Sequence, residues 1–174
     1  YSKLLKLIDD GHDSITSNIT TIAIRRDLRL TLDTFVEYQI GFGNQFHIKS
    51  MSGYNIKSSG FTVAGIQEVV YVSDIPDTNR RTGTLFFFTL PTPGSQSPNI
   101  VRRNVGFINS DSGVITINPV NITGAKTKDG QPILELSAIP HSNDVIGLQD
   151  LYLQLDTSSS LFEPVVDDVS SGLD

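Results

Sequence analysis

Short runs of alternating apolar residues, separated by turn residues, constrain the fold of this chain more than any other feature. The clearest example joins residues 105–109 to residues 114–118 through Ser110-Asp111-Ser112-Gly113. Period-two alternation places apolar side chains on one face of a strand, and a glycine closing a short turn accepts a positive φ angle. The pattern therefore predicts a β-hairpin at this position.

Further runs of the same kind predict a mainly β chain. Apolar residues alternate between Ile22 and Leu32, and the charged residues 25–27 within this run predict a bulge or a change of face. Residues 75–83 have the composition of a longer hairpin loop. The remaining strands are expected at residues 35–40, 46–48, 67–73, 84–90, 133–138 and 151–156. Together they predict an antiparallel β-sandwich or a curled sheet.

A small N-terminal helix makes this an α+β chain. Residues 2–10 place Leu4, Leu5, Leu7 and Ile8 on one side at helical spacing, so we expect a short helix that packs on an end or face of the sheet. The predicted organisation is a helical N-terminal segment (1–19), an antiparallel β domain (20–156) and an acidic C-terminal tail (157–174).

Composition excludes several functional classes. The 174 residues suit one domain with a sizeable core. The absence of Cys excludes disulfides and thiolate metal sites. A net charge of −6 argues against a general nucleic-acid binder, which needs a basic face. The apolar runs are too short to span a bilayer, so direct membrane insertion is not expected.

No constellation of catalytic, cofactor-binding or metal-binding residues emerges. The three histidines, His12, His47 and His141, match no zinc spacing. Carboxylates that are neighbours in sequence, such as Asp74 and Asp77, are typical of turns rather than of facing catalytic pairs. Phosphate-binding glycine loops and nucleophile elbows are also missing from the sequence. We therefore expect a protein that is not an enzyme and needs no cofactor or metal.

Arginine pairs and one polar corner are the candidate interaction residues. The pairs are Arg25-Arg26, Arg80-Arg81 and Arg102-Arg103, and the corner is Ser142-Asn143-Asp144. One interpretation is that the arginines lie on solvated strand and loop faces. The other is that arginine forks of one subunit meet carboxylates of a second subunit, including those of the acidic tail. The corner residues hydrogen-bond nearby backbone groups in turns, so they are expected to fix how the last strand enters the sheet.

Three segments resemble one family of viral assembly proteins. The first is Tyr1-Ser2-Lys3-Leu4-Leu5-Lys6-Leu7-Ile8-Asp9-Asp10 together with residues 15–21; the second is Ser142-Asn143-Asp144-Val145-Ile146 leading into 151–156; the third is 105–113 followed by 114–118. Taken together they are similar to the C-terminal region of a baseplate wedge protein of T-even-type contractile-tailed bacteriophages, the wedge subunit that forms a ring.

The resemblance implies a structural protein of the virion. Such a subunit joins wedges into a ring around the tail hub through contacts with itself, as a dimer or ring, and with other baseplate wedge subunits, after assembly in the host cytoplasm. It implies no catalytic role. The alternative is a carbohydrate- or receptor-binding β-sandwich module of an adhesin or tail fibre, although the chain has no Trp to form a stacking platform for sugars.

Overall fold

The computed structural model describes residues 2–12, 21–48, 54–79, 81–90 and 98–142. These residues form one helix, α1 (Ser2–Asp9), and nine strands, all paired antiparallel. The strands are β1 (Ile24–Arg29), β2 (Phe35–Gly41), β3 (Lys57–Ser58), β4 (Phe61–Val63), β5 (Tyr71–Pro76), β6 (Thr82–Thr89), β7 (Asn99–Asn109), β8 (Val114–Lys128) and β9 (Gln131–Ala138). The predicted class, mainly β with a small N-terminal helix, is confirmed, and the sheet is curled.

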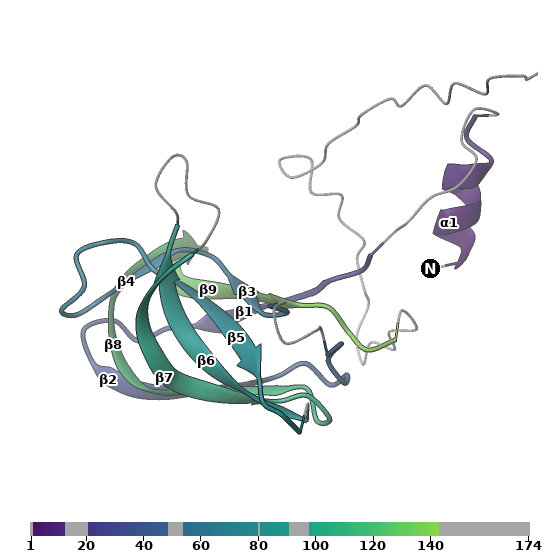
Figure 1. The fold of residues 1–174 in the computed structure, drawn as a ribbon. Coiled ribbons are helices and arrows are strands. Elements are labelled where there is room, and N and C mark those ends of the chain that lie inside the picture. The colour runs from purple at the N-terminus through teal and green to yellow at the C-terminus, as the bar shows by residue number, and fades with distance from the viewer. Residues whose placement is uncertain (1, 13–20, 49–53, 80, 91–97, 143–174) are drawn as a thin grey trace, which may run out of the picture.

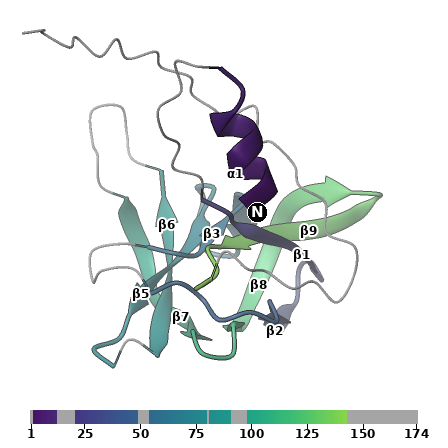
Figure 2. The same cartoon turned by 90° about the vertical axis from the view of Figure 1, so that its right-hand side faces the viewer.

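The curl depends on β8, which is long enough to hold two sets of neighbours. The sheet order is β1-β9-β8-β7-β6-β5. The first half of β8 pairs with β7 and β2, and its second half pairs with β4 and β9. Because each half holds different partners, the sheet bends along β8 and takes the half-barrel form seen in Figures 1 and 2. The predicted hairpin at 110–113 joins β7 to β8, with Asn109 opposite Val114.

A segment that we call the strap, residues 54–64, links the second half of β8 and β9 to β5. Its two short strands pair with β9 and β8, and Phe61 exchanges backbone hydrogen bonds of 3.0 and 2.8 Å with Val70, just before β5. Side chains complete the link: the Val72 amide donates to Ser58 Oγ at 2.7 Å, and Ser73 Oγ donates to the Ile56 carbonyl at 2.7 Å. The strap therefore holds together parts of the sheet that do not pair directly.

The hydrophobic core fills the inside of the curl. On β6 the core side chains are Leu85 and Phe87, and on β8 they include Ile115 and Ile117, all at most 2% exposed. Alternate positions on each strand supply these residues, as the period-two pattern predicts. Burial of each such side chain stabilises the fold by roughly 1.5–3 kcal/mol.

Strand β7 is irregular where it passes β6. Leu85 and Phe87 are two residues apart on β6, but their partners on β7, Gly106 and Arg102, are four residues apart. The extra residues form a bulge in which Asn104 has a φ of +55°. A bulge bends a strand and redirects its side chains. It therefore decides which face of the sheet each nearby side chain occupies.

Several details differ from the sequence predictions. Strand β1 runs through residues 25–27 without a register shift, so the predicted bulge there is wrong. The predicted strand at 46–48 is only a single bridge from Phe46 to Pro140, and β5 begins at Tyr71 rather than at residue 67.

Helix α1 stands away from the sheet in Figure 1, and Leu7 is 71% exposed, so the expected packing on the sheet is not seen. The predicted strand at 151–156 and the acidic tail lie outside the described residues.

Candidate assembly surface

The described arginines of the predicted pairs lie in different surroundings. Arg81 lies in the β5–β6 turn, where its Nε is 3.8 Å from Asp111 Oδ2 of the same chain and its side chain is 77% exposed. An exposed ion pair of this kind contributes only about 0–1 kcal/mol. Ser142 is exposed at the end of the described chain, while Arg80, Asn143 and Asp144 lie outside the described residues.

Arg102 and Arg103 border different faces of the sheet. Arg103 lines a hollow of about 180 Å³ together with Phe86, whereas Arg102 lines a second hollow together with the core residues Phe87 and Val120. Neighbours on a strand point to opposite faces, so the two guanidinium groups do not act together. Only Arg103 belongs to the outer face, the face turned away from the core.

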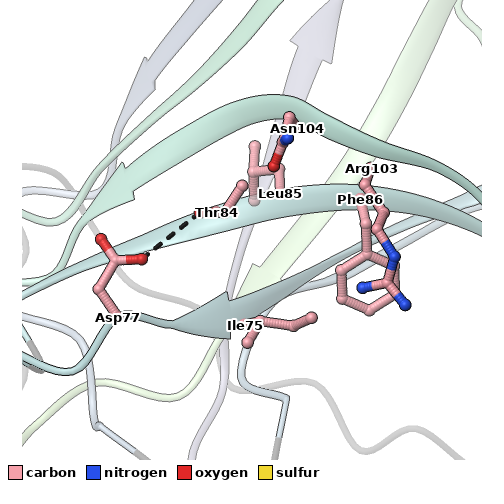
Figure 3. Close-up of a pocket in the computed structure, with 7 residues that line it drawn as sticks. All are labelled: Ile75, Asp77, Thr84, Leu85, Phe86, Arg103 and Asn104. Atoms are coloured by element: carbon pink, nitrogen blue, oxygen red, sulfur yellow. Dashed lines mark hydrogen bonds between the residues drawn. The ribbon is translucent and has the colours of Figure 1, made fainter.

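The hollow that contains Arg103 combines an apolar floor with charged ends (Figure 3). Asp77 and Arg103 lie at opposite ends in the close-up, and Phe86 lies beside Arg103. The Asp77 carboxylate accepts hydrogen bonds from Thr82 Oγ1 at 2.5 Å and from Thr84 Oγ1 at 3.4 Å, which fix its position. The lining residues are Ile75, Asp77, Thr84, Leu85, Phe86, Arg103 and Asn104.

An exposed aromatic side chain adjoins this hollow. Phe107 on β7 lies directly opposite Thr84 on β6 and Thr116 on β8. Directly opposite residues share a face, so Phe107 lies on the outer face beside the Thr84 that lines the hollow. Its side chain is 53% exposed. We call Phe107 and the residues that line the hollow the outer patch.

The exposure of Phe107 is only weakly indicated by the sequence. Phe107 lies between Gly106 and Ile108, and Ile108 is 2% exposed. A Phe-Ile neighbour pair in a strand leaves open which of the two side chains faces the core. Strand pairing decides it: Phe107 lies opposite Thr84, which lines the hollow, and Ile108 lies opposite Ile115, which belongs to the core.

Asp74 and Asp77, one of the carboxylate pairs considered from the sequence, are separated by the sheet structure. Asp74 is 3% exposed and lies under the strap, where it accepts hydrogen bonds from the backbone amides of Asn55 at 2.8 Å and Ile56 at 2.6 Å. Asn55, 5% exposed, donates to the carbonyls of His47 and Ile139 and accepts from the Ile139 amide. This buried cluster holds backbone segments together, whereas Asp77 lies on the outer patch.

A network of charges on β1, β8 and β9 was not predicted from the sequence. Glu135 Oε1 lies 2.8 Å from Lys126 Nζ and 4.0 Å from Arg25, and Asp27 Oδ2 accepts a hydrogen bond from Lys128 Nζ at 2.6 Å. The Asp27 carboxylate raises the pKa of Lys128, mainly through that hydrogen bond. Charges of opposite sign across an outer strand stabilise it modestly and disfavour indiscriminate edge pairing.

Among the residues that the structure describes, no group of three or more His, Cys, Asp or Glu side chains is placed to hold a metal ion. In the same part of the chain, no helix has the length and apolar character needed to cross a membrane.

Comparison of the chain with protein-family models, with curated proteins and with solved structures gives no match. The function is therefore inferred from the chemistry of the surface.

Proposed function

We propose that this chain is a structural assembly module: a wedge subunit of a contractile phage tail baseplate that joins wedges into a ring around the tail hub. Its partners are further copies of itself and other wedge subunits, and its location is the virion. The observation that supports the proposal is the exposed Phe107 beside the Arg103 hollow on the outer patch. The resemblance of the N-terminal, hairpin and corner segments to that family supplies the biological setting.

The outer patch has the chemistry of a subunit interface. Aromatic residues and Arg are enriched in protein–protein interfaces, and charged groups surround an apolar centre. Here Phe107 provides the apolar centre, and Asp77 and Arg103 provide charges of opposite sign. Phe107 is 53% exposed, so covering one ring contributes about half of the roughly 1.5–3 kcal/mol of a full burial, and the two rings of a symmetric pair together contribute about that whole amount. Closed ring symmetry lets such modest contacts add up to a stable assembly.

The test is self-association of Phe107→Ser compared with Phe35→Ser. Phe35 is a matched control because it is 72% exposed but lies on β2, away from the outer patch. Multi-angle light scattering across a concentration series should show a dimer or larger species for the wild type. The F107S substitution should weaken the association by about 10- to 100-fold, and F35S should leave it unchanged. A wild type that stays monomeric at high concentration would refute the proposal.

Arginine and carboxylate contacts between subunits form the second part of the proposal. Arg103 lies at one end of the hollow, and the tail carries Glu163, Asp167, Asp168 and Asp174 without any Lys or Arg. A contact between these charges is screened by salt. Association should therefore weaken as ionic strength rises, and Arg103→Gln should remove most of this salt dependence. Salt-independent association would contradict the role assigned to Arg103.

The alternative, a carbohydrate- or receptor-binding module, has less support from the outer patch. Sugar sites present an open aromatic face together with free polar groups, but Phe86 is 1% exposed and the Asp77 carboxylate is already bonded to two threonines. A monomer whose unfolding temperature rises when a glycan is added would favour the alternative over assembly.

A further inference from the structure

Basic side chains gather on one face of the sheet around β9. Leu134 and Leu136 of β9 belong to the core cluster, so positions 131, 133, 135 and 137 face outward. Residues directly opposite each other on paired strands share a face, so the partners of these four positions on β1, β3 and β8 also face outward. In Figure 2, β1, β8 and β9 lie on the right, whereas β5 and β6 lie on the left. Five of the partners are basic: Arg25, Arg29, Lys57, Lys126 and Lys128.

This face, which we call the basic face, is positive although the chain is acidic. Besides the five cations it carries two carboxylates, Asp27 opposite Glu135, so its formal charge is +3. The chain has 13 basic and 19 acidic residues, which leaves 8 basic and 17 acidic residues, a charge of −9, outside the basic face. With Asp129 of the adjoining β8–β9 turn included, the local charge is still +2. A cationic surface on an otherwise anionic molecule selects acidic partners.

The carboxylates of the basic face lie deeper than the cations around them. The Asp27 and Glu135 side chains are 24% and 18% exposed, whereas those of Arg25, Lys126 and Lys128 are 51%, 57% and 55% exposed. Lys126 Nζ lies 2.8 Å from Glu135, and Lys128 Nζ lies 2.6 Å from Asp27, so each carboxylate already has a cation. An approaching partner therefore meets the cations first.

Two cationic bands cross the basic face, with the carboxylates between them. One band is level with residue 137 of β9 and the other with residue 133, and four residues of a strand span ~13 Å. The bands are Lys57 with Arg25, and Arg29 with Lys126. Each band includes one cation, Lys57 or Arg29, that has no ion-pair partner among the described residues. Both bands therefore keep positive charge that can bind an acidic group.

We propose that the basic face binds an acidic segment of a different protein, whose carboxylates reach both cationic bands. Carboxylates form charge-assisted hydrogen bonds with Arg and Lys. The spacing favours a protein over a nucleic acid. Phosphates follow one another at short, regular intervals, so some would meet the carboxylates between the bands, whereas a protein segment can place a neutral residue there. The outer patch lies on β5, β6 and β7, so this contact goes beyond the self-association proposed above.

An NMR titration of the full chain with the peptide Glu-Glu-Ser-Ser-Glu-Glu tests the proposal. Residues four apart in an extended peptide lie on one face at ~13 Å, so this peptide presents carboxylates to both bands and a serine between them. Amide shifts should change on β1, β9 and the second half of β8, and the changes should shrink as salt is raised. Shift changes centred on β5, β6 and β7 would overturn the proposal, as would a peptide that causes none.

Charge reversal shows whether the bands are the binding site. Arg29→Glu/Lys126→Glu should weaken peptide binding by about tenfold or more, because it inverts one band. The matched control is Lys6→Glu/Arg81→Glu, which changes the net charge equally at exposed positions outside the basic face and should alter binding by less than about threefold. Equal weakening by both pairs would mean that net charge alone drives binding, and the proposal would fail. The amide spectrum of each variant reports its folding, and the wild-type titration depends on neither variant.

An oligothymidylate of the same charge as the peptide separates the two classes of polyanion. The peptide should bind more tightly, and tighter binding of the oligothymidylate would overturn the assignment to an acidic protein. Neither titration requires self-association, so failure here would leave the assembly function proposed above untouched.

Discussion

The buried amide of Asn55 provides the sharpest test of how the strap holds the sheet together. Its Nδ2 donates to the carbonyls of His47 at 2.7 Å and Ile139 at 3.0 Å, and its Oδ1 accepts from the Ile139 amide at 2.7 Å. The Asn55 backbone amide also donates to the buried Asp74 carboxylate. Replacing Asn55 with Ala removes the three side-chain bonds. It leaves the His47 carbonyl and the Ile139 amide without a protein partner, whereas the Ile139 carbonyl keeps its bond from the His47 amide at 2.9 Å.

The expected loss follows from the number and burial of these bonds. A buried polar group left unsatisfied costs about 1–3 kcal/mol, and water entering the site recovers part of this. For two backbone groups we expect Asn55→Ala to lower the free energy of unfolding by about 2–4 kcal/mol. That is a large share of the roughly 5–15 kcal/mol that stabilises a typical domain.

Equilibrium unfolding in guanidinium, followed by far-UV circular dichroism, measures this loss. Asn118→Ala is the matched control, because Asn118 is exposed and its amide makes a single hydrogen bond of 3.2 Å, to the Asn104 carbonyl. The control should lose less than about 1 kcal/mol. If Asn55→Ala and Asn118→Ala unfold at the same denaturant concentration, the strap does not depend on this buried amide, and the reasoning is refuted.

Two further predictions concern turns and surface charge. Gly113→Ala should destabilise the chain far more than Gly130→Ala. Both glycines have a positive φ, of +65° and +75° respectively, so both substitutions strain the backbone. Only at Gly113 would the added Cβ also clash, because it would lie 1.9 Å from the Asn44 carbonyl oxygen. Thermal unfolding of both variants measures the difference, and equal shifts would contradict the close approach. Asp27 raises the pKa of Lys128, so their contact is present below that pKa and is lost as pH rises through it. NMR titration should give a lower Lys128 pKa in Asp27→Asn, and an unchanged value would show that the hydrogen bond is not maintained in solution.

Local turn chemistry was the part of the fold most accessible from the sequence. The hairpin at 110–113 was predicted from its Gly and the strand-like runs around it, and Gly113 does adopt positive φ. The turn between β8 and β9 carries a comparable signal in Asp129-Gly130. Asp129 and Gly130 have φ of +51° and +75°, as expected for the Asp-Gly pair of a two-residue hairpin. Reading that dipeptide would have extended β8 to its full length.

The strap was not predictable from local patterns, because tertiary contacts define it. Its strands β3 and β4 are two and three residues long, too short to show a period. Many of its bonds run to side chains, such as Ser59 Oγ accepting from the Glu135 amide at 3.1 Å. The predicted break at residues 25–27 failed for a related reason. Those charges are accommodated by partners on neighbouring strands, among them Glu135 for Arg25, so the strand stays regular.

The outer patch depends on the bulge in β7, which alternation alone cannot reveal. A bulge turns the side chains within it away from the regular alternation. Val105 is 7% exposed and packs in the core, although Phe107, two residues further on, is 53% exposed. Arg102 and Arg103, which look like a pair in the sequence, border different hollows because neighbours on a strand point to opposite faces. Phe107 lies beyond the bulge and takes the outer face next to Thr84. The proposed interface therefore rests on one arginine and one phenylalanine. Deleting residues of the bulge should alter assembly as strongly as substituting either side chain.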